Sequence, residues 1–468
     1  MARTVAVLGG GIAGLAAAFE LRRLGLKPLL FEAGDRLGGK ILTTPFAGVA
    51  LDAGPDAFLA RVPWASELCH DLGVGDELVA PATSSAFVFS NGQLRRFPEH
   101  LMLGVPTDLD ALRRSGLISA AGVERAAQDL IRPYDGPGTD ESIGSLVRRR
   151  LGAEILDKLI DPLLSGIFAG DTDQLSVAAA APQIAAAAAG GSLIAGARAL
   201  LPVPSAGTGS ATGAASGSAA PVFLTLPGGL GRLVDLLAQR IGADNIRLKS
   251  PVEGLQRSDR GWLVAVAGGR AVPVDAVVVT TPAPVSARLL AEACRSAAGV
   301  LGGIEYSSVV LTSFAWPSAA LGRPLDGSGF LVPRSEGLLM TACSWSSAKF
   351  AHLGGDGVAR LRVSAGRWGD DRIAGLSDTD LVDRLRADLA VTMGIEAPPV
   401  EVRISPWPNG LPQYWPGHLD RLAAAEAALA DQAPGIVVTG AAFRGVGLPA
   451  GIHQARRAAE QIAATLAV

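Results

Sequence analysis

The first forty residues constrain the fold of this chain more than any other stretch. A short apolar run, Thr4–Leu8, leads into the glycine-rich segment Gly9-Gly10-Gly11-Ile12-Ala13-Gly14. A helical pattern follows, and a second apolar run over 28–31 ends at Glu32. The order of strand, glycine turn, helix, strand and acid is typical of a unit that binds a dinucleotide. The sequence therefore predicts a Rossmann-like domain at the start of the chain.

Each glycine of this turn has a physical role in the prediction. Gly9 permits the tight turn, Gly11 lets the backbone approach a pyrophosphate, and Gly14 lets the helix lie close to the strand. The helix N-terminus then offers N–H groups and the positive end of its dipole to the phosphates. We expect Glu32 to accept hydrogen bonds from ribose hydroxyls. At this point NAD, NADP and FAD all remain open as the dinucleotide.

Length and composition limit the class of protein. A chain of 468 residues is expected to form two or three domains, and 49% apolar residues can bury large cores. The net charge of -3 gives no basic field for a nucleic acid. The cysteines Cys69, Cys294 and Cys343 have no metal or redox spacing and fit a reducing compartment. No stretch has the length and apolarity of a transmembrane helix. We therefore expect a cytoplasmic protein without a metal or a transmembrane segment.

The rest of the chain contains further strand and turn patterns. A second glycine pair, Gly38-Gly39, follows Glu32 closely, and 87–94 predicts a hairpin. Residues 109–201 are mainly helical in pattern, and 276–279 predicts a strand buried on both faces of a parallel sheet. A closing strand over 435–440 precedes an amphipathic helix. These patterns predict a nucleotide-binding domain assembled from both ends of the chain and a middle piece.

Motifs spread over the whole chain resemble one known family. The chain resembles the flavin-dependent porphyrinogen oxidases, within the wider amine-oxidase and phytoene-desaturase superfamily. The superfamily motifs are matched by Gly9 to Gly14, Glu32, Arg36 with Gly38-Gly39, Leu226 to Gly229, 278–282, and Thr439 to Ala441 with Arg444 to Pro449. Three narrower segments are similar to those of the porphyrinogen oxidases: Pro162 to Asp171, Trp407 to Tyr414, and Phe443 to Gly447.

The resemblance implies an α/β fold (α+β overall) with a Rossmann-like FAD-binding domain built from discontinuous segments. We expect residues 1–85, 221–290 and 408–468 to form that domain. Residues 86–94 and 291–407 would form a mixed-sheet substrate-binding domain, and 95–204 a helical insertion like a membrane-binding one. Residues 205–220, almost wholly Ser, Gly, Ala and Thr, are expected to be a flexible loop.

The resemblance also implies the residues that contact FAD. They follow the cofactor from its pyrophosphate and adenosine to its flavin end. The implied contacts are Gly9, Gly10, Gly11, Ile12, Ala13, Gly14, Glu32, Ala33, Arg36, Gly39, Lys40, Gly54, Pro55, Asp56, Ala57, Val252, Trp407, Gly440, Val446, Gly447 and Leu448. Phe168 and Tyr414 are expected walls of the substrate cavity. No catalytic acid or base is assigned.

The implied reaction is the six-electron oxidation of coproporphyrinogen III to coproporphyrin III in haem biosynthesis. Three hydride transfers to flavin N5 would be followed by reoxidation with dioxygen and release of hydrogen peroxide. The product would pass to a ferrochelatase, through a transient contact. Protoporphyrinogen IX also remains open as the substrate, since the sequence does not place the arginines that would hold the propionates. An amine oxidase, a carotenoid desaturase and a prenyl-binding protein without flavin are less favoured interpretations of the same fold.

Overall fold

The structure, a computed structural model, describes residues 3–133, 140–201 and 221–466. The predicted flexible loop, 205–220, lies outside the described residues. The chain divides into two compact units. Unit 1 comprises Met1–Val79, Phe223–Ser313 and Glu401–Val468, and unit 2 comprises Ala80–Val222 and Phe314–Val400. The assignment of a cofactor domain, a substrate domain and a helical insertion to parts of these units stays a prediction.

A parallel sheet forms the centre of unit 1. Its order is β11-β2-β1-β15-β21, and every neighbouring pair is parallel. The strands are β1 Thr4–Leu8, β2 Lys27–Phe31, β11 Ile246–Arg247, β15 Ala276–Val279 and β21 Ile436–Val438. All four residues of β15 are buried, which confirms the prediction of a strand covered on both faces. Segments from the start, the middle and the end of the chain thus share one sheet.

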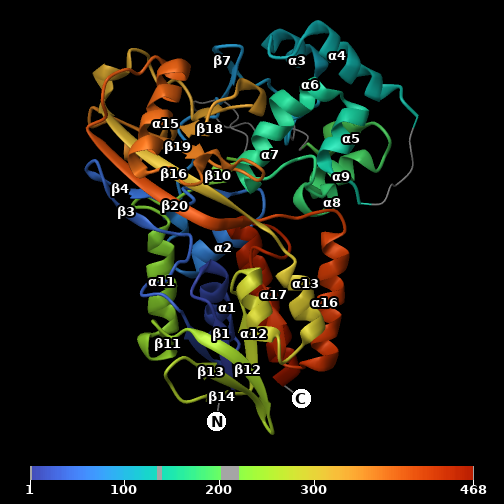
Figure 1. Cartoon of the computed structure of the whole chain (residues 1–468), viewed down its shortest axis with the longest axis vertical. Helices are drawn as coiled ribbons and strands as arrows, with labels where there is room; N and C mark the ends of the chain where they lie inside the picture. The colour runs from blue at the N-terminus through green and yellow to red at the C-terminus, as the bar shows by residue number, and fades with distance from the viewer. Residues whose placement is uncertain (1–2, 134–139, 202–220, 467–468) are drawn as a thin grey trace, which may run out of the picture. The chain divides into compact units, whose positions relative to one another are not determined.

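Both faces of this sheet are covered, because alternate side chains of a strand point to opposite sides. Val5 and Val7 pack into one apolar cluster with helices α1, α2, α11 and α17, whereas Ala6 and Leu8 pack into another with α12, α13 and α16. Figure 1 shows α1 and α17 side by side. The helices are α1 Ile12–Arg23, α2 Trp64–Asp71, α11 Gly231–Ile241, α12 Ala283–Leu290, α13 Arg295–Gly302, α16 His418–Gln432 and α17 Leu448–Leu466.

Smaller sheets complete unit 1. An antiparallel sheet of β12, β13 and β14 packs into the second cluster, through residues such as Trp262. A hairpin of β3 and β4 follows the second glycine pair, and β5 pairs with β10. The bounds are β3 Thr43–Phe46, β4 Val49–Asp52, β5 Phe58–Leu59, β10 Phe223–Leu224, β12 Val252–Ser258, β13 Gly261–Val266 and β14 Val272–Val274, with short helices η1 Gly75–Glu77 and η4 Ala243–Asn245.

A larger sheet has the order β20-β16-β19-β18-β17-β6-β7. The predicted hairpin is confirmed, because β6 and β7 pair antiparallel across Asn91 and Gly92. The strands are β6 Phe87–Ser90, β7 Gln93–Arg96, β16 Tyr306–Pro317, β17 Gly329–Leu331, β18 Met340–Ser344, β19 Val358–Ala365 and β20 Glu401–Pro412. β20 continues through Trp407 to Pro412, a length that the sequence analysis did not predict. Its prolines are tolerated because β20 is an edge strand, which forms backbone hydrogen bonds with a neighbouring strand on one side only.

Helices dominate the first segment of unit 2, as the sequence predicted for 109–201. They are α3 Leu109–Ser115, α4 Ala120–Ala127, α5 Ile143–Arg150, α6 Ala153–Ile155, α7 Asp161–Phe168, α8 Val177–Ala180, α9 Pro182–Ala188 and α10 Leu193–Leu200, with η2 Gln128–Leu130 and η3 Leu156–Ile160 between them and the short strands β8 Leu101–Met102 and β9 Val105–Pro106 before them. The second segment adds α14 Ser346–Lys349, α15 Asp378–Met393, η5 Ser318–Leu321, η6 Arg334–Glu336, η7 Ala351–Leu353 and η8 Asp371–Ile373. Among the described residues, no helix has the length and apolarity to cross a membrane.

Candidate cofactor site

The first glycine turn joins β1 to α1. Gly9 has a φ of +110°, and its N–H donates to the carbonyl of Phe31 on β2 over 2.8 Å. A Cβ on Gly14 would lie 1.8 Å from the carbonyl oxygen of Gly9. Only glycine therefore fits where the first turn of α1 passes the end of β1, as the sequence predicted.

The N-terminus of α1 is open. Gly11 provides no capping side chain, the first turn contains no acidic residue, and no heavy atom lies within 4 Å of a Cβ built on Gly11. The first amides of a helix have no partner within the helix and carry the positive end of its dipole. Free space beside uncapped amides is the arrangement that a phosphate group needs. A pyrophosphate fits here on the shape and charge of the turn itself.

Glu32 holds the turns on either side of it. Its Oε2 accepts from the N–H of Gly10 over 2.6 Å, and its Oε1 accepts from the N–H of Gly34 over 2.7 Å. Both carboxylate oxygens therefore fix backbone, a role that the spacing of the motif did not predict. A carboxylate oxygen can accept more than one hydrogen bond, so the expected contact with a ribose stays a prediction.

The second glycine pair lies directly against the first turn. The N–H of Gly38 donates to the carbonyl of Gly10 over 2.8 Å, and a Cβ on Gly39 would lie 3.1 Å from Cα of Gly11. The guanidinium of Arg36 donates to the carbonyl of Gly39 over 2.7 Å and closes this second turn. Two glycine turns therefore lie together at the N-terminus of α1.

The backbone of Gly54 lies close to the backbone of Lys40 and to the ring of Trp407. A Cβ on Gly54 would lie 2.0 Å from the carbonyl oxygen of Lys40 and 3.5 Å from Cζ2 of Trp407. The indole N–H of Trp407 donates to the carbonyl of Ala53 over 3.0 Å. Burial lowers the pKa of the Lys40 ammonium. Trp407 of β20 therefore fixes the backbone of the segment that follows β4.

The end of the chain reaches the same helix. Gly440 follows β21 and Thr439 and has a φ of +125°. A Cβ on Gly440 would lie 4.0 Å from Cβ of Ala13. A Cβ on Gly451 in α17 would lie 3.8 Å from Cγ2 of Ile12. The last strand and the last helix therefore meet α1 at its first turn, which is the arrangement expected for one ligand bound by both ends of the chain.

Comparison with known proteins now decides the family. The family model described as "Flavin containing amine oxidoreductase" matches residues 12–463.

The chain belongs to this family.

It is similar to the coproporphyrinogen III oxidase of Bacillus subtilis (strain 168), with 35% identity over 461 residues that cover 97% of this chain and 96% of that one. It is 30% identical to the chloroplastic protoporphyrinogen oxidase 1 of Arabidopsis thaliana over 447 residues, which cover 90% and 81% of the two chains. A crystal structure from Exiguobacterium sp. 255-15 has 33% identity and a TM-score of 0.86, and the match covers 99% of both chains. The resemblance drawn from the motifs is confirmed.

This flavin-containing oxidoreductase uses FAD as its cofactor. The glycine turns and the uncapped N-terminus of α1 fit the pyrophosphate of FAD. The individual contacts predicted for the cofactor stay predictions. The structure places the other predicted residues as follows: Ala33 is exposed after β2, Pro55, Asp56 and Ala57 are half-buried between β4 and β5, Val252 begins β12, and Val446, Gly447 and Leu448 lead into α17.

A buried pair of rings holds the loop between β21 and α17. Tyr414 has 0% exposure, and its hydroxyl donates to the carbonyl of Ala441 and accepts from the N–H of Gly445 over 3.1 Å. Its ring stacks on His418 at 4.3 Å, and Nε2 of His418 lies 3.0 Å from the carbonyl oxygen of Phe443. Burial raises the pKa of Tyr414 and lowers that of His418. The sequence predicted Tyr414 as a cavity wall, and nothing in its pattern indicated this hydroxyl role.

The hairpin of β3 and β4 supplies a set of residues that the sequence analysis missed. The carboxylate of Asp52 accepts from the N–H of Leu230 over 3.1 Å, and the hydroxyl of Thr43 accepts from the N–H of Gly231 over 2.8 Å. Arg403 of β20 donates to the hydroxyl of Thr44 over 2.6 Å. A cavity of about 290 Å³ lies beside this junction, lined among others by Arg36 and Arg232. The glycine motif before α11 was the available signal.

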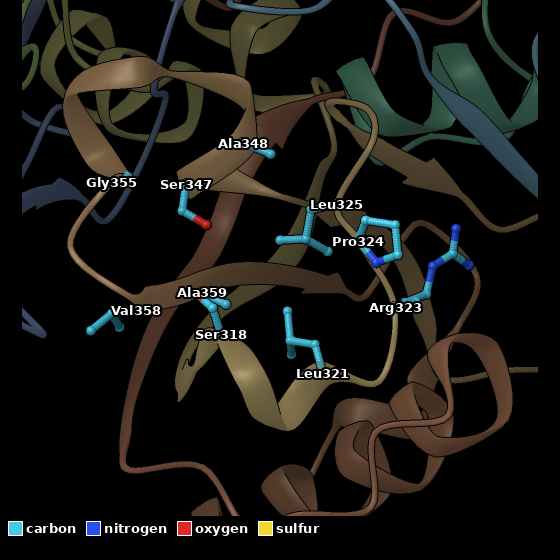
Figure 2. A pocket seen from close by; sticks show the side chains of 11 residues that line it. Ser318, Leu321, Arg323, Pro324, Leu325, Ser347, Ala348, Gly355, Val358 and Ala359 are labelled. Atoms are coloured by element: carbon cyan, nitrogen blue, oxygen red, sulfur yellow. The ribbon is translucent and has the colours of Figure 1, made fainter.

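Unit 2 contains a second cavity of about 230 Å³ (Figure 2). Leu321, Leu325 and Ala359 line it, and Arg323 points its guanidinium away from the other labelled side chains. Ser318, Ser347 and Arg323 add polar groups to this lining. Phe168, the second predicted substrate wall, is 4% exposed at the end of α7, and its contact with a substrate stays a prediction.

Proposed function

We propose that this flavoenzyme oxidises coproporphyrinogen III to coproporphyrin III in haem biosynthesis, with dioxygen as the electron acceptor. The observation that carries the proposal is the similarity over nearly the whole chain to a coproporphyrinogen III oxidase. The similarity includes the segments outside the glycine turns. A likeness confined to the cofactor motifs would support flavin chemistry alone.

The reaction removes six hydrogens from the macrocycle. Each of three rounds takes two electrons and two protons from the porphyrinogen and reduces one dioxygen to one hydrogen peroxide. Bound FAD would accept a hydride in each round and pass the electron pair to dioxygen. The pyrrole protons can leave to water, so the proposal requires no acid or base from the chain.

The residues of this chain contribute binding and positioning. The open amides of α1 would bind the pyrophosphate, and the turn of Gly38 and Gly39 would limit its movement. The hydroxyl of Tyr414 and the imidazole of His418 hold the loop of 441–445 in one conformation. A fixed cofactor is what positions a substrate carbon for transfer, because small displacements reduce the rate strongly.

Protoporphyrinogen IX is the second candidate substrate. The similarity to the chloroplastic protoporphyrinogen oxidase 1 of Arabidopsis thaliana favours it, although that match covers less of both chains. The two substrates differ in charge, since coproporphyrinogen III carries four propionates and protoporphyrinogen IX two. The choice between them therefore depends on how many carboxylates the protein binds.

The test gives the purified flavoprotein both porphyrinogens in parallel. Porphyrin fluorescence, oxygen uptake and peroxide release are followed, with a reaction without protein as the control for spontaneous oxidation. Faster conversion of coproporphyrinogen III, with three dioxygens consumed and three peroxides formed per porphyrin, is the expected result. Preference for protoporphyrinogen IX would reverse the substrate assignment. Oxidation of amines with inert porphyrinogens would reject both substrates.

We further propose that the enzyme acts in the cytoplasm and passes its product to a ferrochelatase. The chemistry supports this, because coproporphyrin III is the aromatic macrocycle into which iron can be inserted. Mixing the flavoprotein with a coproporphyrin ferrochelatase should speed the appearance of the iron porphyrin when compared with free diffusion. An unchanged rate at equal product concentration would show that no contact is needed.

A further inference from the structure

Two arginines lie at one edge of the large sheet in unit 2. Arg334 begins η6, three residues after the end of β17, and Arg367 follows the end of β19 by two residues. β17 and β19 are both antiparallel to β18 in the order β19-β18-β17, so they run in the same direction. Their C-terminal ends therefore lie at the same edge, with one strand between them.

Arg367 is buried without matching acceptors. Its side chain is 4% exposed, and its nearest carboxylate oxygen, on Asp370, lies 3.7 Å from Nε. Within the described residues, its guanidinium makes no hydrogen bond. Asp370 is already used, because its two oxygens accept from Arg372 over 2.8 and 2.6 Å. A buried guanidinium has five N–H donors, and leaving them unpaired is costly.

Arg334 adds a second positive charge to the same place. Its Nε lies 3.3 Å from Oδ2 of Asp161, and its Nη2 donates to the carbonyl of Gly170 over 2.7 Å. Its side chain is 35% exposed, so part of the guanidinium faces outward. The oxygen Oδ1 of Asp161 also accepts from the hydroxyls of Ser165 and Thr172.

Charged groups of both signs surround Arg367. Arg334 and Arg372 are the positive groups that act on it, and Asp161 and Asp370 are the negative ones. Asp388 also acts on Arg372, so the carboxylates of this cluster equal its cations in number. Burial, and then the charge of Arg334, lower the pKa of Arg367. Its ion pair with Asp370, at 3.7 Å, leaves most of its N–H donors without an acceptor among the described residues.

The cluster is attached to a chain segment that lies outside the glycine turns. Gly170 accepts from Arg334, and the neighbouring carbonyl of Ala169 accepts from the N–H of Trp368 over 2.7 Å. Both residues belong to the stretch from Pro162 to Asp171, one of the three narrower motifs of the sequence. This stretch thus connects the end of α7 to both arginine-bearing loops.

We propose that Arg334 and Arg367 together bind one carboxylate of the tetrapyrrole substrate. The inference rests on the proposed function, and it names where one propionate is held. Two guanidiniums present planar pairs of N–H donors, which match the two oxygens of a carboxylate. The bound carboxylate supplies the hydrogen-bond acceptors that Arg367 lacks.

The test uses the FAD-loaded full chain and three arginine variants. Arg367→Met and Arg334→Met each remove one guanidinium and keep much of the side-chain volume. Arg113→Met is the matched control, since Arg113 is an exposed arginine of α3 paired with Asp110. Binding of coproporphyrin III is measured by porphyrin fluorescence, and its tetramethyl ester, which lacks the carboxylates, is titrated in parallel. KM and kcat for coproporphyrinogen III are measured separately.

Each site variant should weaken binding of coproporphyrin III about tenfold or more, because a charge-assisted contact is lost. Binding of the tetramethyl ester should stay unchanged in the same variants. KM should rise more than kcat falls, since the contact is equal in the ground and transition states. Arg113→Met should behave as the unmodified protein. If Arg367→Met does not fold, the half-exposed Arg334→Met carries the same test.

Two outcomes would overturn the inference, and they are distinguishable. Both variants could bind coproporphyrin III as tightly as the unmodified protein, with higher thermal stability of Arg367→Met. This result would mean that Arg367 binds no carboxylate of the substrate. The proposed function would still stand. Failure of the unmodified flavoprotein to bind coproporphyrin III and to oxidise coproporphyrinogen III would instead reject the proposed function, and the inference with it.

Discussion

Many helices of unit 2 begin with a capping side chain, whereas α1 of unit 1 does not. Among the described residues of unit 2, six α-helices begin with a side chain that accepts from an amide of their own first turn; these N-caps are Asp108, Ser119, Ser142, Ser176, Ser192 and Ser377. In unit 1, α1 begins at Gly11, which has no side chain to offer. Caps stabilise a helix by satisfying its free amides. An uncapped glycine instead leaves these amides for a ligand.

A missing local cap is not enough to identify a ligand site. Helix α11 also lacks a capping side chain of its own, yet Asp52 and Thr43 from the β3–β4 hairpin accept from its first amides. A Cβ on Gly231 would lie 2.8 Å from the Thr43 hydroxyl oxygen, whereas a Cβ on Gly11 would meet nothing within 4 Å. The open space beside α1, rather than the absent cap, is the feature that indicates a phosphate.

The largest effect should follow from a methyl group at Gly14. In Gly14→Ala the new Cβ would lie 1.8 Å from the carbonyl oxygen of Gly9, so β1 and α1 must separate. We expect loss of the bound flavin and a loss of about 4 kcal/mol or more in unfolding free energy, in the range of severe overpacking. Flavin absorbance and urea unfolding of the purified protein measure both.

Gly11→Ala is the matched variant for this comparison. Its Cβ enters open space at a φ of -72°, so the fold should keep its stability when FAD is absent. The same methyl group would occupy the proposed pyrophosphate position, and FAD affinity should fall about tenfold or more. Wild-type affinity in this variant would show that the space beside α1 is not the phosphate site.

The next largest effect lies in unit 2 and should spare the flavin. Asp129 is 0% exposed, and it accepts from Nε of Arg150 and from the N–H of Ile194 in the first turn of α10. Asp129→Ala removes the buried carboxylate that pairs with Arg150 and accepts from the amide of Ile194, and breaking such a buried pair costs about 3–5 kcal/mol. Urea unfolding should show this loss, while the flavin content per folded molecule stays the same.

An exposed ion pair provides the control for Asp129→Ala. Arg148 pairs with Asp173, and both side chains are close to half exposed. Arg148→Ala should change stability by no more than about 1 kcal/mol, since water screens the pair. Equal losses in the two variants would mean that burial does not set the cost.

Much of unit 1 could be predicted from local patterns. The alternation of Val5 and Val7 with Ala6 and Leu8, the apolar run of β15 and the closing strand β21 each follow from how a parallel sheet is covered. The close approach of Gly14 to Gly9 is also readable from the motif, because glycine is required there. These features depend on neighbours in sequence or on one repeated arrangement.

The remaining features depend on residues far apart in the chain. The pairing of Tyr414 with the loop of 441–445, and of Asp52 with the amide of Leu230, cannot be deduced from spacing. The full length of β20 was missed because its prolines indicate a strand end unless the strand is known to lie at an edge. The scarcity of acceptors around Arg367, whose ion pair with Asp370 is 3.7 Å long, is a property of its surroundings and not of its sequence.

A smaller effect is expected from a change in the stacked rings of Tyr414 and His418, which hold the loop of 441–445. Tyr414→Phe removes the hydroxyl and leaves the N–H of Gly445 and the carbonyl of Ala441 without this partner. Unpaired buried groups cost about 1–3 kcal/mol, and FAD affinity should fall severalfold because the loop relaxes. Flavin release on dilution and thermal unfolding measure the two effects.

Tyr306→Phe is the control for Tyr414→Phe. It also removes a buried hydroxyl, but one that makes no hydrogen bond to the loop of 441–445. The hydroxyl of Tyr306 accepts from the N–H of Ala283 at the start of α12, and burial raises its pKa to about 12. This variant should lose stability of the same order and keep its affinity for FAD. A parallel fall in FAD affinity would remove the special role assigned to Tyr414.

The smallest effect completes the comparison of helix starts. The hydroxyl of Ser142 accepts from the N–H of Ser145 at the N-terminus of α5. Ser142→Ala should cost about 1 kcal/mol, and Ser142→Gly only a few tenths, because glycine leaves the first amides open to water. FAD affinity should not change in either variant. Urea unfolding measures the free energy of unfolding of both variants. A larger loss for Ser142→Gly than for Ser142→Ala would contradict the view that these first amides need a partner, either a side chain or an external group.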